Sequence, residues 1–316
     1  MLTKIKMGLS ACLLGEKVRY DGGHKLDRFI VGTLGKFMDF VPVCPEVECG
    51  LGVPREAMRL VAALDGPRLV TIKSGVDHTE RMRHWARQKV VELEREQLCG
   101  FIFKSDSPSS GMERVKIYDG KGGVSKTGVG LFAREFMAHF PLIPVEEEGR
   151  LHDPGLRENF LERVFTLKRW RETLSLGQKL GHLVEFHTRH KLLILSHSPE
   201  HYRIMGKLLA QMKDLPLAVL YEQYQTLLMQ ALSLKATVKK NVNVLLHVMG
   251  FFKRNLARSE KEELLEIIDN YRQGFVPLIV PVTLLNHYVR KYEQPYLKEQ
   301  YYLNPHPLEL KLRLHV

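Results

Sequence analysis

The chain has 316 residues, of which 44% are hydrophobic and 26% are charged, and it has no apolar run near the roughly 18 to 20 residues of a membrane span. These values exclude a disordered chain and an integral membrane protein. Lys and Arg number 47 against 36 Asp and Glu, and the net charge of +11 divides into roughly +3 for residues 1–150 and +8 for 151–316. We therefore expect two domains, a polyanion as the partner of the second, and no membrane partner.

The cysteines and the first residues indicate the compartment. The basic start MLTKIKMGLSACLLG lacks a small-residue cleavage pattern, so we expect a cytoplasmic protein. All four cysteines lie in the first hundred residues, at Cys12, Cys44, Cys49 and Cys99. In a reducing compartment this clustering favours metal binding or redox chemistry over disulfides.

Residues 1–150 alternate between strand and helix patterns. Short apolar or β-rich runs predict five strands, at Lys6–Leu9, Phe40–Val43, Arg68–Ile72, Phe101–Lys104 and Phe140–Val145. Amphipathic spacing predicts three helices, at Asp27–Met38, Asp77–Gln97 and Val129–His139. The alternation predicts an α/β domain with a parallel sheet whose faces are covered.

Residues 151–316 predict a different, all-α domain. The segment VEEEGRLHDPGLRENF is typical of a linker, and no strand pattern follows it. Ser198 before Pro199 predicts a helix start, and Ser259 with Glu262 predicts a capping box. Helical patterns cover seven segments: Arg157–Leu174, Gly177–Leu195, Pro199–Lys213, Leu217–Ala231, Lys235–Arg254, Lys261–Gln273 and Val282–Tyr292.

The ends of the predicted parallel strands are the candidate site, because open α/β sheets bind ligands beyond the carboxyl ends of their strands. Cys12, Cys44, Cys49 and Ser107 follow such ends, and we expect them to converge in one cleft. Cys99 precedes its strand, so we expect it to be a core thiol.

Three of these cysteines favour a metal centre. Cys44 and Cys49 have a spacing that some iron–sulfur proteins use, and Cys12 adds a third thiolate from a neighbouring strand. Three protein ligands leave one metal position open for a substrate, and zinc is the alternative metal. Glu46 is a candidate general base beside that metal, although an ion-paired surface glutamate is the alternative. The loop SDSPSSG places hydroxyls and backbone donors in a turn that suits an anion or a carbonyl-like group.

Three longer segments carry a resemblance to a known family. SACLLGEKVRYDGG, VPVCPEVECGLGVPRE and FIFKSDSPSSGMERVKIYD resemble the signature blocks of the thiouracil desulfidase family, which read roughly CLLG-x-x-CRYDG, CPE-x-x-GGL-x-x-PR and SPSCG. The resemblance spans residues 6–145, and the remainder resembles a helical domain fused to it in one branch of the family. It implies a Rossmann-like desulfidase domain at 1–150 and a basic helical RNA-binding domain at 151–316.

The resemblance also implies a cofactor and roles for individual residues. The family carries a 4Fe-4S cluster held by three cysteines, and Cys12, Glu46 and Ser107 match family positions. Where the family has cysteine, this chain has Val18 and Ser110, and where the family has glycine, it has Cys49. We therefore expect Cys12, Cys44 and Cys49 to be the ligands; the alternative is that Ser110 is an oxygen ligand and Cys44 lies outside the cluster.

The implied reaction is the hydrolytic, non-redox conversion of 4-thiouridine in tRNA to uridine with release of sulfide. We expect Glu46 and Ser107 to be catalytic, and Lys104, Ser109 and Ser110 to bind the substrate. One alternative is a desulfidase of free thiouracil or thiouridine, so small thiolated pyrimidines remain possible substrates. Another is a non-catalytic, metal-containing RNA-binding protein.

The basic helical half supplies the expected RNA contacts. Its lysines and arginines lie near one another and, close to the carboxyl end, alternate with tyrosines in HYVRKYEQPYLKEQYY. Charge combined with stacking rings is typical of RNA binding. The predicted RNA-binding residues are Lys235, Lys239, Lys240, Lys253, Arg254, Arg290 and Lys291. No pattern in the sequence sets the oligomeric state.

Overall fold

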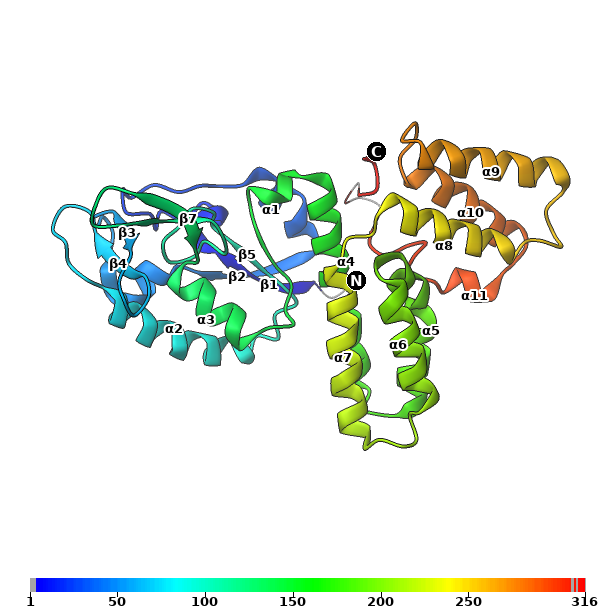
Figure 1. Cartoon of the computed structure of the whole chain (residues 1–316), viewed down its shortest axis with the longest axis horizontal. Helices are drawn as coiled ribbons and strands as arrows, with labels where there is room; N and C mark the ends of the chain where they lie inside the picture. Colours follow the sequence, from blue (N-terminus) through cyan, green and yellow to red (C-terminus); the bar gives the residue numbers. More distant parts are fainter. Residues whose placement is uncertain (1–3, 308–309, 311, 316) are drawn as a thin grey trace. The chain divides into compact units, whose positions relative to one another are not determined.

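A four-stranded parallel sheet organises the first part of the chain. The computed structural model describes residues 4–307, 310 and 312–315, and the chain divides into two units, Met1–Asp153 and Pro154–Val316 (Figure 1). The sheet has the order β2-β1-β5-β8, and every neighbouring pair in it is parallel. Its strands are β1 (Ile5–Ser10), β2 (Met38–Val43), β5 (Phe101–Phe103) and β8 (Val145–Glu147). The predicted parallel sheet is confirmed, and the carboxyl ends of β1, β2 and β5 lie at one edge.

A second, mixed sheet was not predicted. Its order is β4-β3-β6-β7, with antiparallel outer pairs and a parallel central pair. The strands are β3 (Met58–Val61), β4 (Arg68–Thr71), β6 (Val115–Tyr118) and β7 (Val124–Gly128). The prediction that Arg68–Ile72 joins the parallel sheet was wrong, because a short turn lets β4 pair back on β3. Each of β3 and β6 has a charged residue among its four residues, and four of the five residues of β7 are polar or glycine, so these strands lack the apolar run used to find strands.

Two elements begin or end away from their predicted bounds. The helix expected at Asp27–Met38 is α1 (Arg28–Gly32) followed by the 3-10 turn η2 (Leu34–Lys36). Asp27 caps α1 by accepting a hydrogen bond from the backbone N–H of Ile30 at 2.9 Å. The strand expected at Phe140–Val145 begins only at Val145, because Pro141 and Pro144 precede it without N–H groups for a strand ladder.

Two helices supply the apolar cover of the first unit. α2 (Thr79–Glu94) and α3 (Leu131–His139) lie where helices were predicted and pack against each other (Figure 1). The rings of Phe132 and Phe136 on α3 contact those of Phe101 and Phe103 on β5, with ring centroids 4.7 to 6.1 Å apart. Gly8 on β1 is required beside this cluster, because a Cβ there would lie 2.1 Å from the Phe101 ring.

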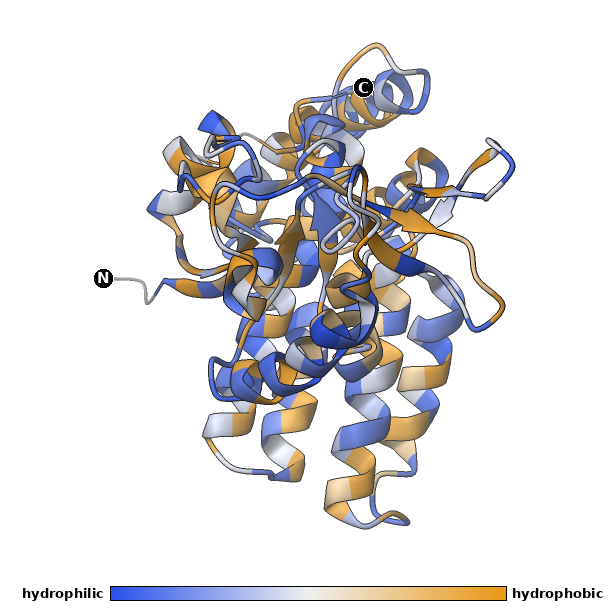
Figure 2. Cartoon of the chain, turned by 90° about the vertical axis from the view of Figure 1, so that its left-hand side faces the viewer, coloured by the Kyte–Doolittle hydropathy of each residue, from blue (hydrophilic) through white to orange (hydrophobic). Residues whose placement is uncertain are grey.

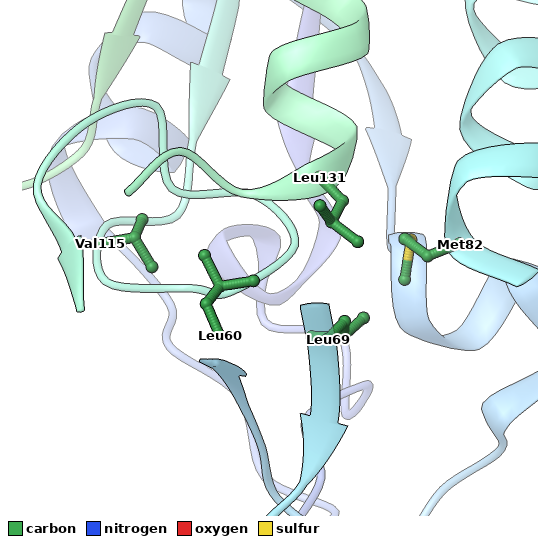
Figure 3. Packing of buried hydrophobic residues seen from close by; sticks show 5 residues of the cluster. All are labelled: Leu60, Leu69, Met82, Val115 and Leu131. Carbon is green, nitrogen blue, oxygen red and sulfur yellow. The ribbon is translucent and has the colours of Figure 1, made fainter. Parts of the chain in front are cut away.

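The second sheet has its own cluster against the same helices. Figure 3 shows its five buried residues: Leu60, Leu69, Met82, Val115 and Leu131. Cys49 and Trp85 pack against this cluster from outside. One face of the second sheet is therefore part of the core, and the other face is left for solvent.

The second unit is helical, as predicted. Among the described residues from 154 onward there is no strand, and hydrophilic and hydrophobic residues alternate along the helices (Figure 2). The helices are α4 (Pro154–Ser175), α5 (Leu180–His197), α6 (Pro199–Ala210), α7 (Leu217–Ser233), α8 (Val238–Gly250), α9 (Arg258–Arg272), α10 (Ile279–Lys291) and α11 (Pro295–Lys298). The Trp170 ring lies in their core, stacked on Tyr224 and edge-on to Phe186.

The two predicted helix starts in this unit have different outcomes. Ser198 caps α6 by accepting a hydrogen bond from the His201 N–H, and Pro199 is the first helical residue. The capping box predicted from Ser259 and Glu262 was wrong. Instead α9 begins one residue before Ser259, and the Glu260 carboxylate accepts a hydrogen bond from the Ala257 N–H at 2.8 Å.

Hydropathy along the helices bears on the membrane prediction. In the described residues, none of the helices combines the length and the apolar composition that crossing a bilayer requires.

The aromatic cluster predicts the effect of a core substitution. Phe136→Ala removes a fully buried ring that contacts four other rings, so we expect the free energy of unfolding to fall by about 3 to 5 kcal/mol in urea denaturation. The matched control is Phe275→Ala, whose side chain is 72% exposed, and we expect a change within about 0.5 kcal/mol. Equal effects of the two substitutions would contradict this packing.

Candidate functional site

A cavity of about 350 Å³ lies at the carboxyl edge of the parallel sheet. Three connections form its wall: the turn after β1, the turn after β2 and the loop after β5. The side chains with hydroxyl, thiol or charged groups that line it are Ser10, Cys12, Arg19, Tyr20, Lys25, Cys44, Glu46, Arg55, Glu56, Lys104, Ser105, Asp106, Ser107 and Ser110. Residues separated by almost a hundred positions therefore share one site.

The Glu46 carboxylate is the centre of the polar contacts in this cavity. Its Oε1 accepts hydrogen bonds from the hydroxyls of Ser109 and, at 3.5 Å, Ser107. Its Oε2 lies 3.7 Å from the Arg55 guanidinium and 3.6 Å from the Cys44 sulfur. The Glu46 side chain is only 14% exposed, so these donors replace most of its hydration. This arrangement holds a carboxylate beside a thiol in a partly dry pocket.

The segment SDSPSSG, residues 105–111, is called the serine loop here, and the start of α3 fixes its backbone. The N–H groups of Leu131 and Phe132, at the first turn of that helix, donate to the carbonyls of Pro108 and Ser109. Gly130 permits this close approach, because a Cβ there would lie 2.4 Å from the Ser109 backbone. Ser107 further accepts the N–H of Ser110 at 3.1 Å. The loop is thus held by backbone contacts, and the hydroxyls of Ser107 and Ser109 are directed to Glu46.

Two thiols lie in the cavity wall. Cys12 stands on the 3-10 turn η1 (Ala11–Leu14), and Cys44 directly follows β2; both are buried. Burial raises the pKa of Cys12 to about 11, with Lys104 opposing the shift and Glu46 adding to it. Burial and then the Glu46 charge raise the pKa of Cys44 to about 12. In the absence of a bound cation, both sulfurs are neutral thiols near pH 7.

Cys49 and Ser110 differ in their access to the cavity. Cys49, on the π-helical turn η3 (Val47–Leu51), does not line it: its thiol donates to the Glu46 carbonyl at 3.3 Å and packs against the second-sheet cluster. Ser110 does line the cavity, is 3% exposed, and its hydroxyl has no hydrogen-bond partner in the part of the chain that the structure describes. The structure thus brings together Cys12, Cys44 and Ser110. Within the described residues, no set of three His, Cys, Asp or Glu side chains forms a metal site.

The other predicted residues of this domain have defined places. Lys104 lines the cavity, but its ammonium is bound by Glu148 and, at 2.9 Å, by the Ser105 hydroxyl. Ser109 is fully buried and lies behind the cavity wall, in contact with Glu46. Cys99 is buried, as expected of a core thiol.

Arg55 is a residue of the site that the sequence analysis missed. Its side chain is 9% exposed, and its guanidinium donates to the carbonyls of Val18 and Gly52 at 3.0 Å and faces Glu46. The signal was present, since Arg55 is the second-last residue of the segment VPVCPEVECGLGVPRE, in which Glu46 also lies. Spacing alone gave no reason to connect the two side chains, because they are nine residues apart in an irregular segment.

The predicted RNA-binding residues separate into two groups. Lys240 donates to the carbonyls of His197 and Lys235, and Lys291 is paired with Glu260 at 2.7 Å, so both have structural contacts. The others are exposed and, among the described residues, have no ion pair: Lys235, Lys239, Lys253, Arg254 and Arg290. Tyr288 and Tyr302 are buried, which removes two rings from the predicted stacking surface.

Two family models, one curated protein and one solved structure are similar to parts of this chain. Residues 7–148 match the model of the 2-thiouracil desulfurase family, and residues 191–307 match a family of unknown function, DUF1722. The chain is 32% identical over 157 residues to the uncharacterized protein YbgA of Escherichia coli strain K12, covering 49% of this chain and 93% of that protein. It is also 32% identical to a solved [4Fe-4S]-dependent thiouracil desulfidase, TudS, over 48% of this chain and 95% of that one, with a TM-score of 0.39.

The raised thiol pKa values predict slow alkylation with a steep pH dependence. In metal-free protein, we expect iodoacetamide to modify Cys12 and Cys44 about tenfold faster for each pH unit from 7 to 10, because only the thiolate reacts and both pKa values lie above this range. Mass spectrometry of the peptides measures both rates. A rate that levels off below pH 9 would contradict the raised pKa values.

Proposed function

Because this chain belongs, through residues 7–148, to the 2-thiouracil desulfurase family, we propose that it is an iron–sulfur-dependent desulfidase that converts 4-thiouridine in tRNA to uridine. The observation that carries the proposal is the Glu46 carboxylate, held by serine hydroxyls 3.6 Å from the Cys44 sulfur in a cavity. A carboxylate base beside soft sulfur ligands suits the hydrolysis of a carbon–sulfur bond.

The cavity provides two thiols that could be ligands of a cluster, and a hydroxyl that could be the third ligand. Cys12 and Cys44 are buried thiols on adjacent connections, and a metal centre would stabilise the thiolates that burial now disfavours. For the third ligand we propose the Ser110 oxygen in place of Cys49, because Ser110 is unpartnered in the described structure and borders the cavity. The [4Fe-4S] dependence in the name of the similar TudS agrees with this cofactor.

A bound cluster would supply a soft Lewis acid for the sulfur of the thiocarbonyl. Residues of the chain itself accept the proton from the attacking water and position the group that accepts it. Glu46 takes a proton from the water that attacks the carbon. The carbon–oxygen bond forms, the carbon–sulfur bond breaks and the sulfur leaves as hydrosulfide, with no net transfer of electrons. Ser107 and Ser109 fix the carboxylate by hydrogen bonds, and the Arg55 guanidinium lies 3.7 Å from its Oε2 on the other side.

The charge distribution supports tRNA as the substrate. The second unit carries roughly +8 of the net charge, and five of its predicted contact residues are exposed cations without acidic partners among the described residues. A free thiolated pyrimidine is the second candidate substrate, because the cavity of about 350 Å³ lies wholly within the first unit and is large enough for a base.

The proposed ligand set predicts which substitutions remove iron. We expect Cys12→Ala and Cys44→Ala to abolish the bound iron and the visible absorbance of anaerobically reconstituted protein, because each removes a thiolate from the cavity wall. Ser110→Cys should retain the cluster and Ser110→Ala should lower its occupancy, whereas the control Cys49→Ala should leave the iron content unchanged. Loss of iron in Cys49→Ala alone would restore Cys49 as the third ligand.

The role of Glu46 predicts a selective loss of turnover. We expect Glu46→Gln to lower kcat on the 4-thiouridine nucleoside about 10² to 10⁴-fold, because the amide cannot accept the proton from water. Glu56→Gln is the matched control: this residue lines the same cavity, but its carboxylate is bound to the backbone and hydroxyl of Ser74. The assay follows loss of the thiocarbonyl absorbance at equal iron content. Equal activity of the two variants would exclude Glu46 as the base.

A further inference from the structure

Three cations without acidic partners lie on the second sheet. Arg59 on β3 is half-buried, and Lys116 on β6 and Lys126 on β7 are exposed. Across the described parts of the chain none of the three forms an ion pair, and the Nε of Arg59 has no hydrogen-bond partner. Arg68, on the edge strand of the same sheet, is in contrast paired with Asp65 and Asp77. The sheet therefore carries a positive charge that the protein itself does not neutralise.

The three side chains belong to one face. Leu60 and Val115 point into the core, so their neighbours Arg59 and Lys116 point to the opposite face. On β7, Ser125 is paired with Ile117, which packs on the core, and its hydroxyl lies 3.3 Å from that of Thr127. Lys126, between these two residues, therefore points away from the core with the other cations.

The aromatic ring of Tyr118 lies on the same face as the three cations. Tyr118 on β6 alternates with Ile117 and so shares the face of Lys116. The Arg59 guanidinium lies 5.0 Å from the centre of its ring. Val61 and Val124 pair with Tyr118 from the two neighbouring strands, and they leave an apolar surface around the ring. We name Arg59, Lys116, Tyr118 and Lys126 the sheet face.

We infer that the sheet face binds single-stranded RNA on one side of the base that enters the cavity. Unpaired cations attract phosphates, while a tyrosine ring and a guanidinium stack on bases, and this combination distinguishes an RNA strand from an acidic protein surface. The face adjoins the site at Ala57, which lines the cavity two residues before Arg59 and whose carbonyl still accepts a hydrogen bond from the Ile72 N–H at 2.9 Å. The choice of RNA rests on the proposed function; the uncompensated charge and the ring do not depend on it.

Binding of a fluorescein-labelled oligouridylate of about twelve nucleotides to the full-length protein tests this inference by fluorescence anisotropy. We expect the double variant Lys116→Ala, Lys126→Ala to bind about tenfold more weakly. The slope of log affinity against log salt should fall by about 1.4, because each phosphate contact on a single strand contributes about 0.7. We expect Tyr118→Leu to weaken binding about tenfold with an unchanged slope, because it removes stacking and no charge.

The control double variant is Lys36→Ala, Arg87→Ala, which removes the same charge from η2 and α2 and should leave the affinity and the slope unchanged. Equal losses of affinity in the two double variants would overturn the inference. Heparin, a polyanion without bases, is the comparison for Tyr118. If Tyr118→Leu lowered the affinity for heparin as much as the affinity for oligouridylate, the inference would also be overturned. Turnover of tRNA containing 4-thiouridine by the unsubstituted, cluster-reconstituted protein is measured separately. Its absence would overturn the proposed function, whereas unchanged oligouridylate affinity of the sheet-face variants would overturn this inference.

Discussion

The buried carboxylate of Glu46 is the group on which the arrangement of the site depends. A carboxylate that is mostly removed from water is costly unless hydrogen bonds and an opposite charge replace its hydration. Here the partners come from different places in the chain: Ser107 and Ser109 from the loop after β5, and Arg55 from the segment before β3. The site forms only when these segments are packed, so the fold and the polar centre stabilise each other.

The parallel sheet and the helices could be predicted because their signals are local. The apolar runs of β1, β2 and β5 and the amphipathic spacing of α2 belong to single segments, and strand ends in such sheets meet at one edge. The second sheet could not be predicted in the same way. Arg59, Lys116 and Lys126 interrupt its strands, and what makes these segments strands is their pairing with one another and the packing of Leu60 and Val115 on the helices.

The candidate site shows the same division between local and non-local signals. Cys12, Cys44, Glu46 and Ser107 were predicted from their positions after strands, and all four line the cavity. Cys49 was chosen from its spacing to Cys44, but the turn η3 carries its thiol towards the apolar cluster. The access of Ser110 to the cavity depends on how α3 holds the serine loop, which no pattern within the loop reveals.

The proposed reaction of this chain is the hydrolytic removal of sulfur from 4-thiouridine. The most direct measurement is an anaerobic incubation of the cluster-reconstituted full-length protein with tRNA containing 4-thiouridine, followed by quantification of uridine in the digested RNA and of released sulfide. The account predicts one uridine and one sulfide for each 4-thiouridine lost, with no added electron donor or acceptor. Unchanged 4-thiouridine, or turnover that requires a reductant, would contradict it.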